Sequence, residues 1–572
     1  MNSNTPVASV VTRTAWLICL IAAIGFAFDT YELLMLPLIA GPALSELLQV
    51  PANHPMVTNW VGRLLWMTAL CGGVFGLLGG WLTDRLGRKT VLAGSIALYS
   101  LSPVCAALST SLTWFVIFRC ATFVGVCVEF VAAITWLAEV FPEKRQREKA
   151  LGWTQAFASI GGLLVTGVNV WILKHAADLP LIGVAEPFNG HAFWRYTLIS
   201  GLMPAIPIAL LLPFVPESPV WVEKRRTGTL RRPNLGELFS PQLRRVTLVT
   251  AALSACAYAA AFGALQLTPT RVVPGLADLA PQRQVLKPLQ EDAKKLNEQL
   301  TAALPAFQKA TSEVPGLVEL SGQRAKLRIA LRTARRPLEA LGATAPVPAA
   351  LQSQLTTLSN RMGELDKKLN DLTGAAPDAK KALLDREKWM GQIAGNREKQ
   401  SASDEIIKQR GNTVQLWQEL GGLGGRIALA LLVATALSRG RLLRLFQLPA
   451  LLLFPLTYLY LFRSQPEVFQ WGMALCGFVV VAQFSYFGEY LPKVFPLHLR
   501  GTGGSFATNV GGRMFGTSAA YATSNLIAPA ISANSTFEQV ATAAAFMGGG
   551  VMVLGFCLSF LLPEPMVKRD AE

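Results

Sequence analysis

The sequence predicts an all-α membrane protein in which twelve membrane-spanning helices form two similar halves, interrupted by one soluble helical insert. Of its 572 residues, 52% are hydrophobic and 15% are charged, whereas soluble domains carry about 25% charge. The charge is also uneven, because residues 271–415 (the insert) hold 39 of the 88 charged side chains. A short internal repeat, described below, indicates the two halves.

Twelve apolar stretches are long enough to cross the hydrocarbon core, which takes about 20 residues. The N-terminus lacks the basic start and the cleavage site of a removable signal, and its apolar run continues to membrane length, so we expect it to be a retained first span. The predicted spans are 14–38, 58–82, 90–109, 112–138, 150–173, 194–214, 245–268, 416–437, 446–463, 468–490, 502–527 and 538–562.

Basic side chains cluster in alternate connections between these spans, a pattern that orients membrane helices with the basic loops in the cytoplasm. The connections after spans two, four, six and eight are rich in Lys and Arg, whereas those after spans one, three and eleven contain none. We therefore expect both termini in the cytoplasm and the insert outside it, with a bacterial inner (plasma) membrane as the best fit. A net charge of +16 could indicate nucleic-acid binding, but the placement of the basic residues in alternate loops argues against it.

Two short segments repeat along the chain. Leu-Ala-Glu-Val-Phe-Pro ending at Pro142 recurs as Leu-Pro-Lys-Val-Phe-Pro ending at Pro496, 354 positions later. Residues 212–218 resemble 561–565, in which Pro563 lies 347 positions after Pro216. Two six-span halves separated by the insert explain both offsets. We therefore divide the chain into an N-terminal bundle 1–222, a cytoplasmic linker 223–244, span seven 245–270, the insert 271–415 and spans eight to twelve 416–572.

The insert is predicted to be helical, because apolar residues recur in it at spacings of three and four, which is typical of a coiled-coil seam. The seam positions are Leu351, Leu355, Leu358, Met362, Leu365, Leu369 and Leu372, and less regularly Leu286, Leu289, Ala293, Leu296 and Leu300. Turn signals at Pro315–Gly316, 342–348 and 374–377 divide it into three or four helices, which we expect to fold into an antiparallel bundle or hairpin. A solvated spacer and a module that binds a protein partner through residues 281–412 both fit this pattern.

Several motifs lie at the ends of the spans. They are Gly80-x-x-x-Asp84-Arg85-x-Gly87-Arg88-Lys89 after span two; Arg119, Gly125 and Glu129 on span four; Trp194-Arg195 and Pro216-Glu217-Ser218-Pro219 at the two ends of span six; and Leu499-Arg500-Gly501-Thr502-Gly503, with Asn509 and Arg513, at span eleven. Together they resemble signatures of the major facilitator superfamily (MFS), in its sugar-porter-like and metabolite:proton symporter branch. The resemblance implies two pseudo-symmetric six-helix bundles that alternate the access of a central substrate site.

The chain also departs from these signatures. Val220 stands in place of an arginine after span six, and Phe123 and Cys127 replace two glycines of the span-four pattern. The QQxSGxN stretch of sugar porters is absent from span seven, and Lys493 stands in place of an acidic residue after span ten. The second copy of the loop motif, residues 437–441, contains no acid. These departures argue against hexose transport of the familiar kind.

The resemblance implies that the loop after span two forms a gate with its neighbours. The expected gating residues are Gly80, Asp84, Arg85, Gly87, Arg88, Lys89, Glu139, Arg147, Glu217 and Arg500. We expect Asp84 to accept hydrogen bonds from the start of span eleven near 503–505, where the helix dipole is positive, or to pair with a basic residue at the end of span four. Such a contact would hold the two halves together on the cytoplasmic side.

Ionisable side chains inside spans cost about 2.5–3.5 kcal/mol on insertion scales and are therefore candidates for function. Asp29 and Glu32 are three residues apart and share a helix face. Repulsion between their negative charges therefore raises the affinity of each carboxylate for a proton. We expect this pair and Glu129 to carry the coupled proton. In the alternative, Glu32 lies near the outer interface and is solvated, which leaves Asp29 alone.

The candidate substrate contacts are Arg119, Tyr31, Gln155, Trp136, Gln483, Tyr486 and Arg513. We expect Arg119 to meet Asp29 or an anionic substrate and Arg513 to face the interior, whereas Arg63 and Arg426 could extend to the outer interface. In the alternative, the buried charges form an ion-pair network that only fixes helix packing.

These observations predict a secondary active transporter that moves a small polar metabolite, with an organic anion slightly favoured, as a proton symporter. The alternatives are a sugar transporter of the same fold and a sensor or assembly platform that uses the insert. No HExxH or GxxxxGK motif occurs, and we expect no enzyme activity, no metal and no cofactor. The expected partners are the substrate, a proton or another coupling ion, and the bilayer.

Overall fold

The computed structural model describes residues 8–50, 55–141, 144–176, 178–184, 188–203, 205–229, 233–341, 349–374, 376–433 and 438–563. Within these ranges the regular structure is helical, and no strand occurs in them. The turn predicted at 342–348 lies outside these ranges. Parts of other predicted segments also lie outside them, including 230–232 of the linker, residue 375 of the turn at 374–377, 434–437 of span eight and the C-terminus from 564 onward.

The N-terminal half comprises residues 8–226, and two of its six spans are built from two helices each. Its helices are α1 (Ala8–Leu47), α2 (Pro55–Leu86), α3 (Arg88–Ala107), α4 (Leu112–Val140), α5 (Lys144–Ala156), α6 (Ala158–His175), α7 (Phe193–Ser200), α8 (Ala205–Leu211) and α9 (Pro219–Arg226). The fifth span is divided at Phe157, between α5 and α6, and the sixth consists of α7 and α8.

The C-terminal half comprises residues 244–275 and 416–563, and several of its spans contain π-helical turns, in which the backbone bonds span five residues. Its elements are α10 (Arg244–Gly263), η3 (Leu265–Leu267), η4 (Thr268–Val272), η5 (Val273–Gly275), the end of α14 (Pro377–Val433), α15 (Arg439–Pro455), η7 (Leu456–Leu461), α16 (Phe462–Ser464), α17 (Phe469–Val494), α18 (Arg500–Ser505), η9 (Phe506–Gly516), α19 (Ala519–Tyr521), η10 (Ala522–Ile527), α20 (Ala528–Ala530) and α21 (Thr536–Ser559).

Ten helices in the described ranges are long and apolar enough to cross a membrane, and each coincides with one of the twelve predicted spans. Of the other two, the described part of the predicted span 416–437, residues 416–433, forms the last part of α14, a 57-residue helix that begins in the insert. The stretch 502–527 is divided among short α and π segments from α18 to η10. Twelve spans therefore stays a prediction, and the two halves together form the all-α architecture that was expected.

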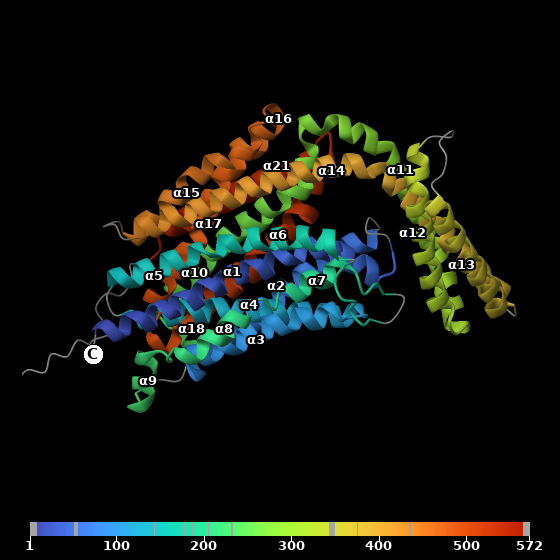
Figure 1. Cartoon of the computed structure of the whole chain (residues 1–572). Coiled ribbons are helices and arrows are strands. Elements are labelled where there is room, and N and C mark those ends of the chain that lie inside the picture. The colour runs from blue at the N-terminus through green and yellow to red at the C-terminus, as the bar shows by residue number, and fades with distance from the viewer. Residues whose placement is uncertain are drawn as a thin grey trace, which may run out of the picture.

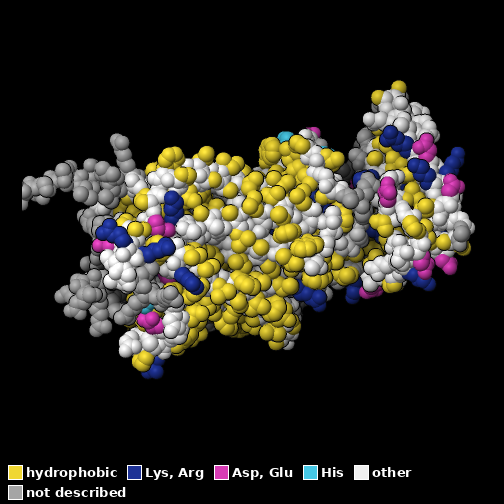
Figure 2. Space-filling view, turned by 90° about the horizontal axis from the view of Figure 1, so that it is seen from below, with side chains coloured by type: hydrophobic (Ala, Val, Ile, Leu, Met, Phe, Trp, Pro, Cys, Tyr) yellow, Lys and Arg dark blue, Asp and Glu magenta, His cyan; other side chains and the backbone are white. Residues whose placement is uncertain are grey.

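The two halves lie side by side along their length. In Figure 1, α1 to α8 (blue to green) face α15, α17 and α21 (orange to red), and the contacts between the halves run through α2, α4 and α5 on one side and α14, α17, α18 and η9 on the other. In Figure 2, hydrophobic side chains cover the middle of the visible face, and charged side chains gather toward its ends. This belt suits a protein surrounded by lipid.

The insert consists of α11 (Ala280–Glu313), α12 (Leu317–Leu341), α13 (Ala349–Thr373) and the first part of α14. Its helix ends fall at the three predicted turns. In Figure 1, α12 and α13 project as a paired hairpin at the end of the molecule opposite to α9. The predicted seam of α13 is half-buried from Leu351 to Leu365 and fully buried at Leu369, but Leu372 is exposed and Thr373 is buried in its place.

A charged cluster and a small apolar core tie the helices of the insert together. Arg324 of α12 donates from Nε and Nη2 to Glu387 of α14 at 2.8 and 3.0 Å and also contacts Asp366 of α13. Beside this cluster, the buried Leu317, Leu320, Leu369 and Leu383 pack together. The insert is therefore a folded unit within the described residues.

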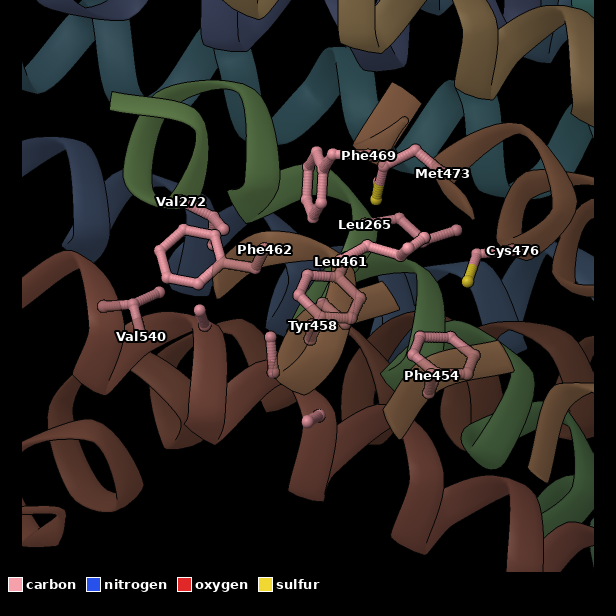
Figure 3. Packing of buried hydrophobic residues seen from close by; sticks show 14 of the residues in the cluster. Leu265, Val272, Phe454, Tyr458, Leu461, Phe462, Phe469, Met473, Cys476 and Val540 are labelled. Carbon is pink, nitrogen blue, oxygen red and sulfur yellow. The ribbon is translucent and has the colours of Figure 1, made fainter. Parts of the chain in front are cut away.

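An apolar cluster joins the root of the insert to the C-terminal half. In Figure 3, the side chains of Phe454, Tyr458 and Phe462 lie among Leu265, Val272, Phe469 and Met473. Val414 of α14 belongs to the same cluster and is fully buried. Next to it, Arg410 of α14 donates to Asp278 at 3.1 Å and to Gln470 at 2.7 Å. The insert is thus anchored on the C-terminal half at both of its ends.

The insert also reaches the N-terminal half. Leu304 of α11 packs against the buried cluster around the end of α1. Arg386 of α14 stacks over the Phe307 ring at 4.5 Å and donates from Nη2 to the main-chain oxygen of Gln49 at 3.4 Å. Nearby, Glu46 accepts hydrogen bonds from Trp194 and Arg195, which fixes the ends of α1 and α7. The insert therefore bridges the two halves.

Candidate functional site

At the end of the molecule opposite to the insert, Asp84 of α2 connects the two halves. Its carboxylate accepts hydrogen bonds from the main-chain N of Gly501 at 2.9 Å and of Thr502 at 2.7 Å, and from Thr502 Oγ1 at 2.7 Å. The start of span eleven was the expected partner, and the contact lies at its first turn rather than near 503–505. Gly80 makes the approach possible, because a Cβ there would collide with Ser505.

Arg88, the first residue of α3, extends this contact into a buried network. Its guanidinium donates to Glu139 of α4 at 3.0 and 2.9 Å, to the main-chain oxygen of Leu497 at 3.1 Å, and lies 3.5 Å from Asp84. Glu139 also pairs with Arg500 of α18 at 3.6 Å. The basic partner of Asp84 is thus Arg88, not a residue at the end of span four. We call Asp84, Arg88, Glu139 and their partners on 497–502 the latch.

Glu217 holds the turn between α2 and α3 in place. Its carboxylate accepts hydrogen bonds from the main-chain N atoms of Arg88 and Lys89 at 2.9 and 3.0 Å. Gly87 has φ +107°, which favours glycine, and Trp221 Nε1 donates to the Asp84 main-chain oxygen at 3.0 Å.

The two remaining predicted gating residues are Arg85 and Arg147. Arg85 is exposed and stacks over Trp81 at 4.9 Å, and Arg147 is half-buried on α5. Their gating roles stay predictions.

A matching contact occurs in the C-terminal half, although the second loop motif has no acid. Arg439 opens α15 as Arg88 opens α3, and its Nη2 lies 3.3 Å from Oε1 of the fully buried Glu489 on α17. Lys493 contacts the same carboxylate. Glu489 supplies the acid that the loop lacks. The sequence analysis missed it, although an acid inside a predicted span with Lys four residues later was a usable signal.

A cavity of about 110 Å³ lies between the two halves. Four charged residues line it: Asp29 of α1, Glu419 and Arg426 of α14, and Arg513 of η9. The other lining residues are apolar, aromatic or uncharged polar; the aromatic ones are Phe26, Phe130, Tyr258, Phe262, Phe484 and Phe487, and the uncharged polar ones include Gln155, Ser159, Gln266 and Gln418. The charged, aromatic, apolar and uncharged polar lining residues each come from both halves.

Asp29 and Arg513 form an ion pair across the two halves. Arg513 Nη2 lies 3.2 Å from each carboxylate oxygen of Asp29. Its Nε and Nη1 are buried and have no hydrogen-bond partner among the described residues. Arg513 therefore faces the interior, as expected, and retains donors for another group.

Arg426 also reaches across the halves, which corrects the expectation that it extends to the outer interface. The residue is 9% exposed. Its Nη1 donates to the main-chain oxygen of Gln155 at 3.0 Å and to Ser485 Oγ at 3.1 Å. The long helix α14 carries Arg426 to the cavity, where a main-chain oxygen and a hydroxyl oxygen accept hydrogen bonds from its Nη1. By contrast, Arg63 is exposed on α2, and its position at the outer interface stays a prediction.

Glu32 and Arg119 form a second buried pair within the N-terminal half. Arg119 Nη1 lies 3.5 Å from Glu32 Oε2, so its carboxylate partner is Glu32 and not Asp29. Glu32 is 1% exposed, which excludes the solvated alternative in this conformation. Glu129 is fully buried beside Gly25 of α1, and neither of its oxygens has a hydrogen-bond partner within the described ranges.

The predicted substrate contacts separate into two groups. Gln155 and Arg513 line the cavity. Arg119, Tyr31, Trp136, Gln483 and Tyr486 are buried elsewhere: Tyr31 bonds to Ser200 at 2.5 Å, Gln483 donates to the main-chain oxygen of Val479 at 3.1 Å, and the Tyr486 ring stacks on Tyr490 at 5.5 Å. Their substrate roles stay predictions. The cavity also contains Glu419, Gln418 and Gln266, which the sequence analysis missed because they belong to no motif.

A family model described as the Major Facilitator Superfamily matches residues 15–282. The solved structure of the MFS proton:xylose symporter XylE bound to 6-bromo-6-deoxy-D-glucose superimposes with a TM-score of 0.55, at 17% identity, over 97% of this chain and 97% of that chain. The family match covers residues 15–282, which is most of the N-terminal half and span seven, and the fold of the described residues is similar to that of a solved MFS protein. The MFS fold extends over both halves, with the cavity between them.

Curated MFS relatives match part of the chain. The niacin transporter NiaP of Acinetobacter baylyi is 25% identical over 215 residues, which is 38% of this chain and 43% of the relative. The arabinose-proton symporter of Bacillus subtilis is 27% identical over 203 residues, 35% and 37% of the two chains. The chain thus matches less than half the length of these relatives. The MFS proteins it resembles are transporters, not enzymes.

Proposed function

We propose that this MFS protein is a proton-coupled secondary transporter of a small organic anion with a flat apolar body, such as an aromatic carboxylate. One observation carries the proposal. Two buried arginines, Arg426 and Arg513, line a cavity whose walls carry six aromatic side chains. Arginine is suited to binding carboxylates through paired hydrogen bonds, and aromatic walls are suited to a planar ring.

The arginines have hydrogen-bonding capacity left for a ligand. Nε and Nη1 of Arg513 and Nε of Arg426 are buried donors without a partner among the described residues. An unsatisfied buried donor is costly, and a hydrogen bond to a charged acceptor removes that cost. A carboxylate between the two guanidiniums would therefore be held at the boundary between the halves.

A sugar is the second candidate. The amide side chains of Gln155, Gln266 and Gln418 line the cavity, and such groups can bind hydroxyls. The relatives include both a niacin transporter and an arabinose-proton symporter, so they support either substrate class. We favour the anion because a carboxylate is a stronger acceptor than a sugar hydroxyl for the donors of Arg426 and Arg513 that lack a partner among the described residues.

We propose that transport proceeds by alternating access, in which the two halves rock about the cavity. The Asp29–Arg513 pair joins the halves beside the substrate. Protonation of Asp29 or of Glu129 would remove a buried negative charge and weaken such contacts. The latch closes one end of the molecule in the conformation described here, and its release would open that end.

A thermal-shift measurement with matched ligands tests the proposed substrate class. We expect benzoate to stabilise the purified chain, and the neutral isostere benzamide and xylose to have little effect. A ligand at 100 times its Kd adds about 2.7 kcal/mol to the stability of the state it binds. Stabilisation by xylose and not by benzoate would support the sugar transporter, and equal effects of benzoate and benzamide would contradict a role for the arginines.

For the topology, we propose that both termini and the latch lie in the cytoplasm, with the insert outside a bacterial inner membrane. The alternation of basic loops in the sequence supports this orientation. The placement of the latch and the insert at opposite ends of the molecule is consistent with it.

Deleting most of the insert should leave transport intact. The structure suggests removing 284–406, because Asp278 and Arg410 are paired at 3.1 Å and a short Gly-Ser linker can join the stumps without disturbing the anchoring cluster. We expect uptake of the substrate by proteoliposomes to persist. A folded deletion variant that binds the substrate but no longer transports it would contradict this expectation. If the full-length chain transports none of the tested compounds, a sensor or assembly platform that binds a protein partner through residues 281–412 is favoured.

A further inference from the structure

Glu419 and Arg426 place a second acid and a second base on the cavity wall opposite Asp29 and Arg513. They lie seven residues apart on α14, about two helical turns, and therefore share a helix face. Both line the cavity. Neither belongs to a motif, and the mechanism proposed above assigns no role to Glu419.

The four charged residues of the cavity balance one another. Asp29 and Glu419 offset Arg426 and Arg513 when all four are ionised. A substrate carboxylate adds one more negative charge to a site enclosed by protein. Because an uncompensated buried charge is costly, binding is favoured if one acid takes up a proton at the same time.

The two acids differ in how firmly they are held. Both oxygens of Asp29 face Arg513 Nη2 at 3.2 Å, and Arg513 can bind a ligand through Nε and Nη1 without leaving Asp29. Glu419 accepts one long hydrogen bond, from Gln418 Nε2 at 3.5 Å. No ion pair within 4 Å of Glu419 occurs among the described residues. Neutralising Glu419 therefore costs fewer and weaker contacts than neutralising Asp29 would.

We propose that Glu419 takes up the proton that accompanies the substrate anion, and that the ligand carboxylate then balances the charge of Arg426. The proposal rests on the proposed function. The step is a proton transfer: a hydronium ion of the solvent gives one proton to the Glu419 carboxylate, so one O–H bond breaks, one forms, and a water molecule is left. The bound state keeps the charge of the empty state, so substrate and proton cross together.

Other groups that face the cavity could share this proton. The titratable and charged ones are Asp29 of α1, Tyr258 of α10, Arg426 of α14 itself and Arg513 of η9. The helices α5, α6 and α17 contribute no titratable side chain to the described cavity wall. Asp29 in the cavity wall and Glu129, the other proton carrier proposed above, are thus the acids that the experiment must distinguish from Glu419.

Calorimetry of benzoate binding to the full-length chain tests the proposal. Titrations in two buffers of different ionisation enthalpy give the number of protons taken up on binding. We expect about one proton for the unaltered chain, near zero for Glu419→Gln, and about one for Glu419→Asp. Glu405→Gln, an exposed acid on the same helix, serves as the matched control and should behave as the unaltered chain.

The outcomes separate the two proposals. If benzoate does not bind the unaltered chain, the proposed function fails and this inference fails with it. If benzoate binds and Glu419→Gln still takes up one proton, the role of Glu419 is overturned while the function stands. If Glu419→Gln does not bind benzoate, Glu419→Asp decides: the pH midpoint of benzoate affinity should move lower, because Asp is intrinsically more acidic than Glu, and an unchanged midpoint overturns the inference.

Discussion

Asp84→Asn is expected to open the end of the protein that the latch closes. The Asp84 carboxylate accepts three hydrogen bonds from Gly501 and Thr502, and bonds to a charged acceptor contribute about 1.5–3 kcal/mol each. An asparagine turns an amide N–H₂ toward one or more of these donors. Since 1.4 kcal/mol is a factor of ten, we expect the open population to rise at least tenfold.

Cysteine accessibility measures this change. A Thr508→Cys reporter lies in the cavity wall and is buried in the closed state. In inside-out vesicles, its maleimide labelling should become about tenfold faster with Asp84→Asn. Glu223→Gln on α9 is the control, because this exposed acid lies outside the latch. Labelling that is no faster with Asp84→Asn than with the control would show that the latch does not hold the closed state.

Arg513→Gln is expected to abolish ligand binding and to destabilise the protein. The substitution leaves Asp29 buried without its counter-ion, which costs about 3–5 kcal/mol for a fully buried pair. Asp29→Asn added to Arg513→Gln removes the orphaned charge. The double variant should therefore regain most of the lost stability but not the binding of an anion.

Thermal unfolding and benzoate binding, measured on the same samples, separate the two effects. Arg63→Gln is the matched control, since Arg63 is an exposed arginine on α2, and it should leave both properties nearly unchanged. If the double variant stays as unstable as Arg513→Gln alone, the Asp29–Arg513 pair is not the source of the loss. If it binds benzoate normally, Arg513 is not a substrate contact.

Features that depend on local sequence were predictable here. Hydropathy located ten of the twelve predicted spans among the described residues, and Pro and Gly located the breaks of the insert, because both signals act over a few residues. The motif around Asp84 predicted a contact with span eleven. The first turn of that helix, at Gly501 and Thr502, proved to be the partner because Gly80 lets the backbones meet there.

Features that depend on helix rotation and on distant partners were not predictable. Asp29 and Arg513 are separated by 484 positions, and hydropathy does not indicate which face of a helix meets which neighbour. Arg426 was expected near the outer interface because the sequence shows where a span begins but not that α14 continues through it as one helix. Arg119 was matched to the wrong acid, since Asp29 and Glu32 are one turn apart and only packing selects between them.

Because α14 is one continuous helix, a movement of its end at the cavity also moves the insert. The helix contains no internal proline, and about 50 Å of it, at 1.5 Å per residue, separates Glu419 at the cavity from Arg386 at the Gln49 contact. A tilt of a few degrees at the cavity is amplified along this arm into a displacement of several ångströms at its tip. A hydrogen bond of 3.4 Å does not survive such a displacement, so each transport cycle would break and remake it. A fluorophore on the projecting hairpin would then report, from outside the bilayer, events that occur at its centre.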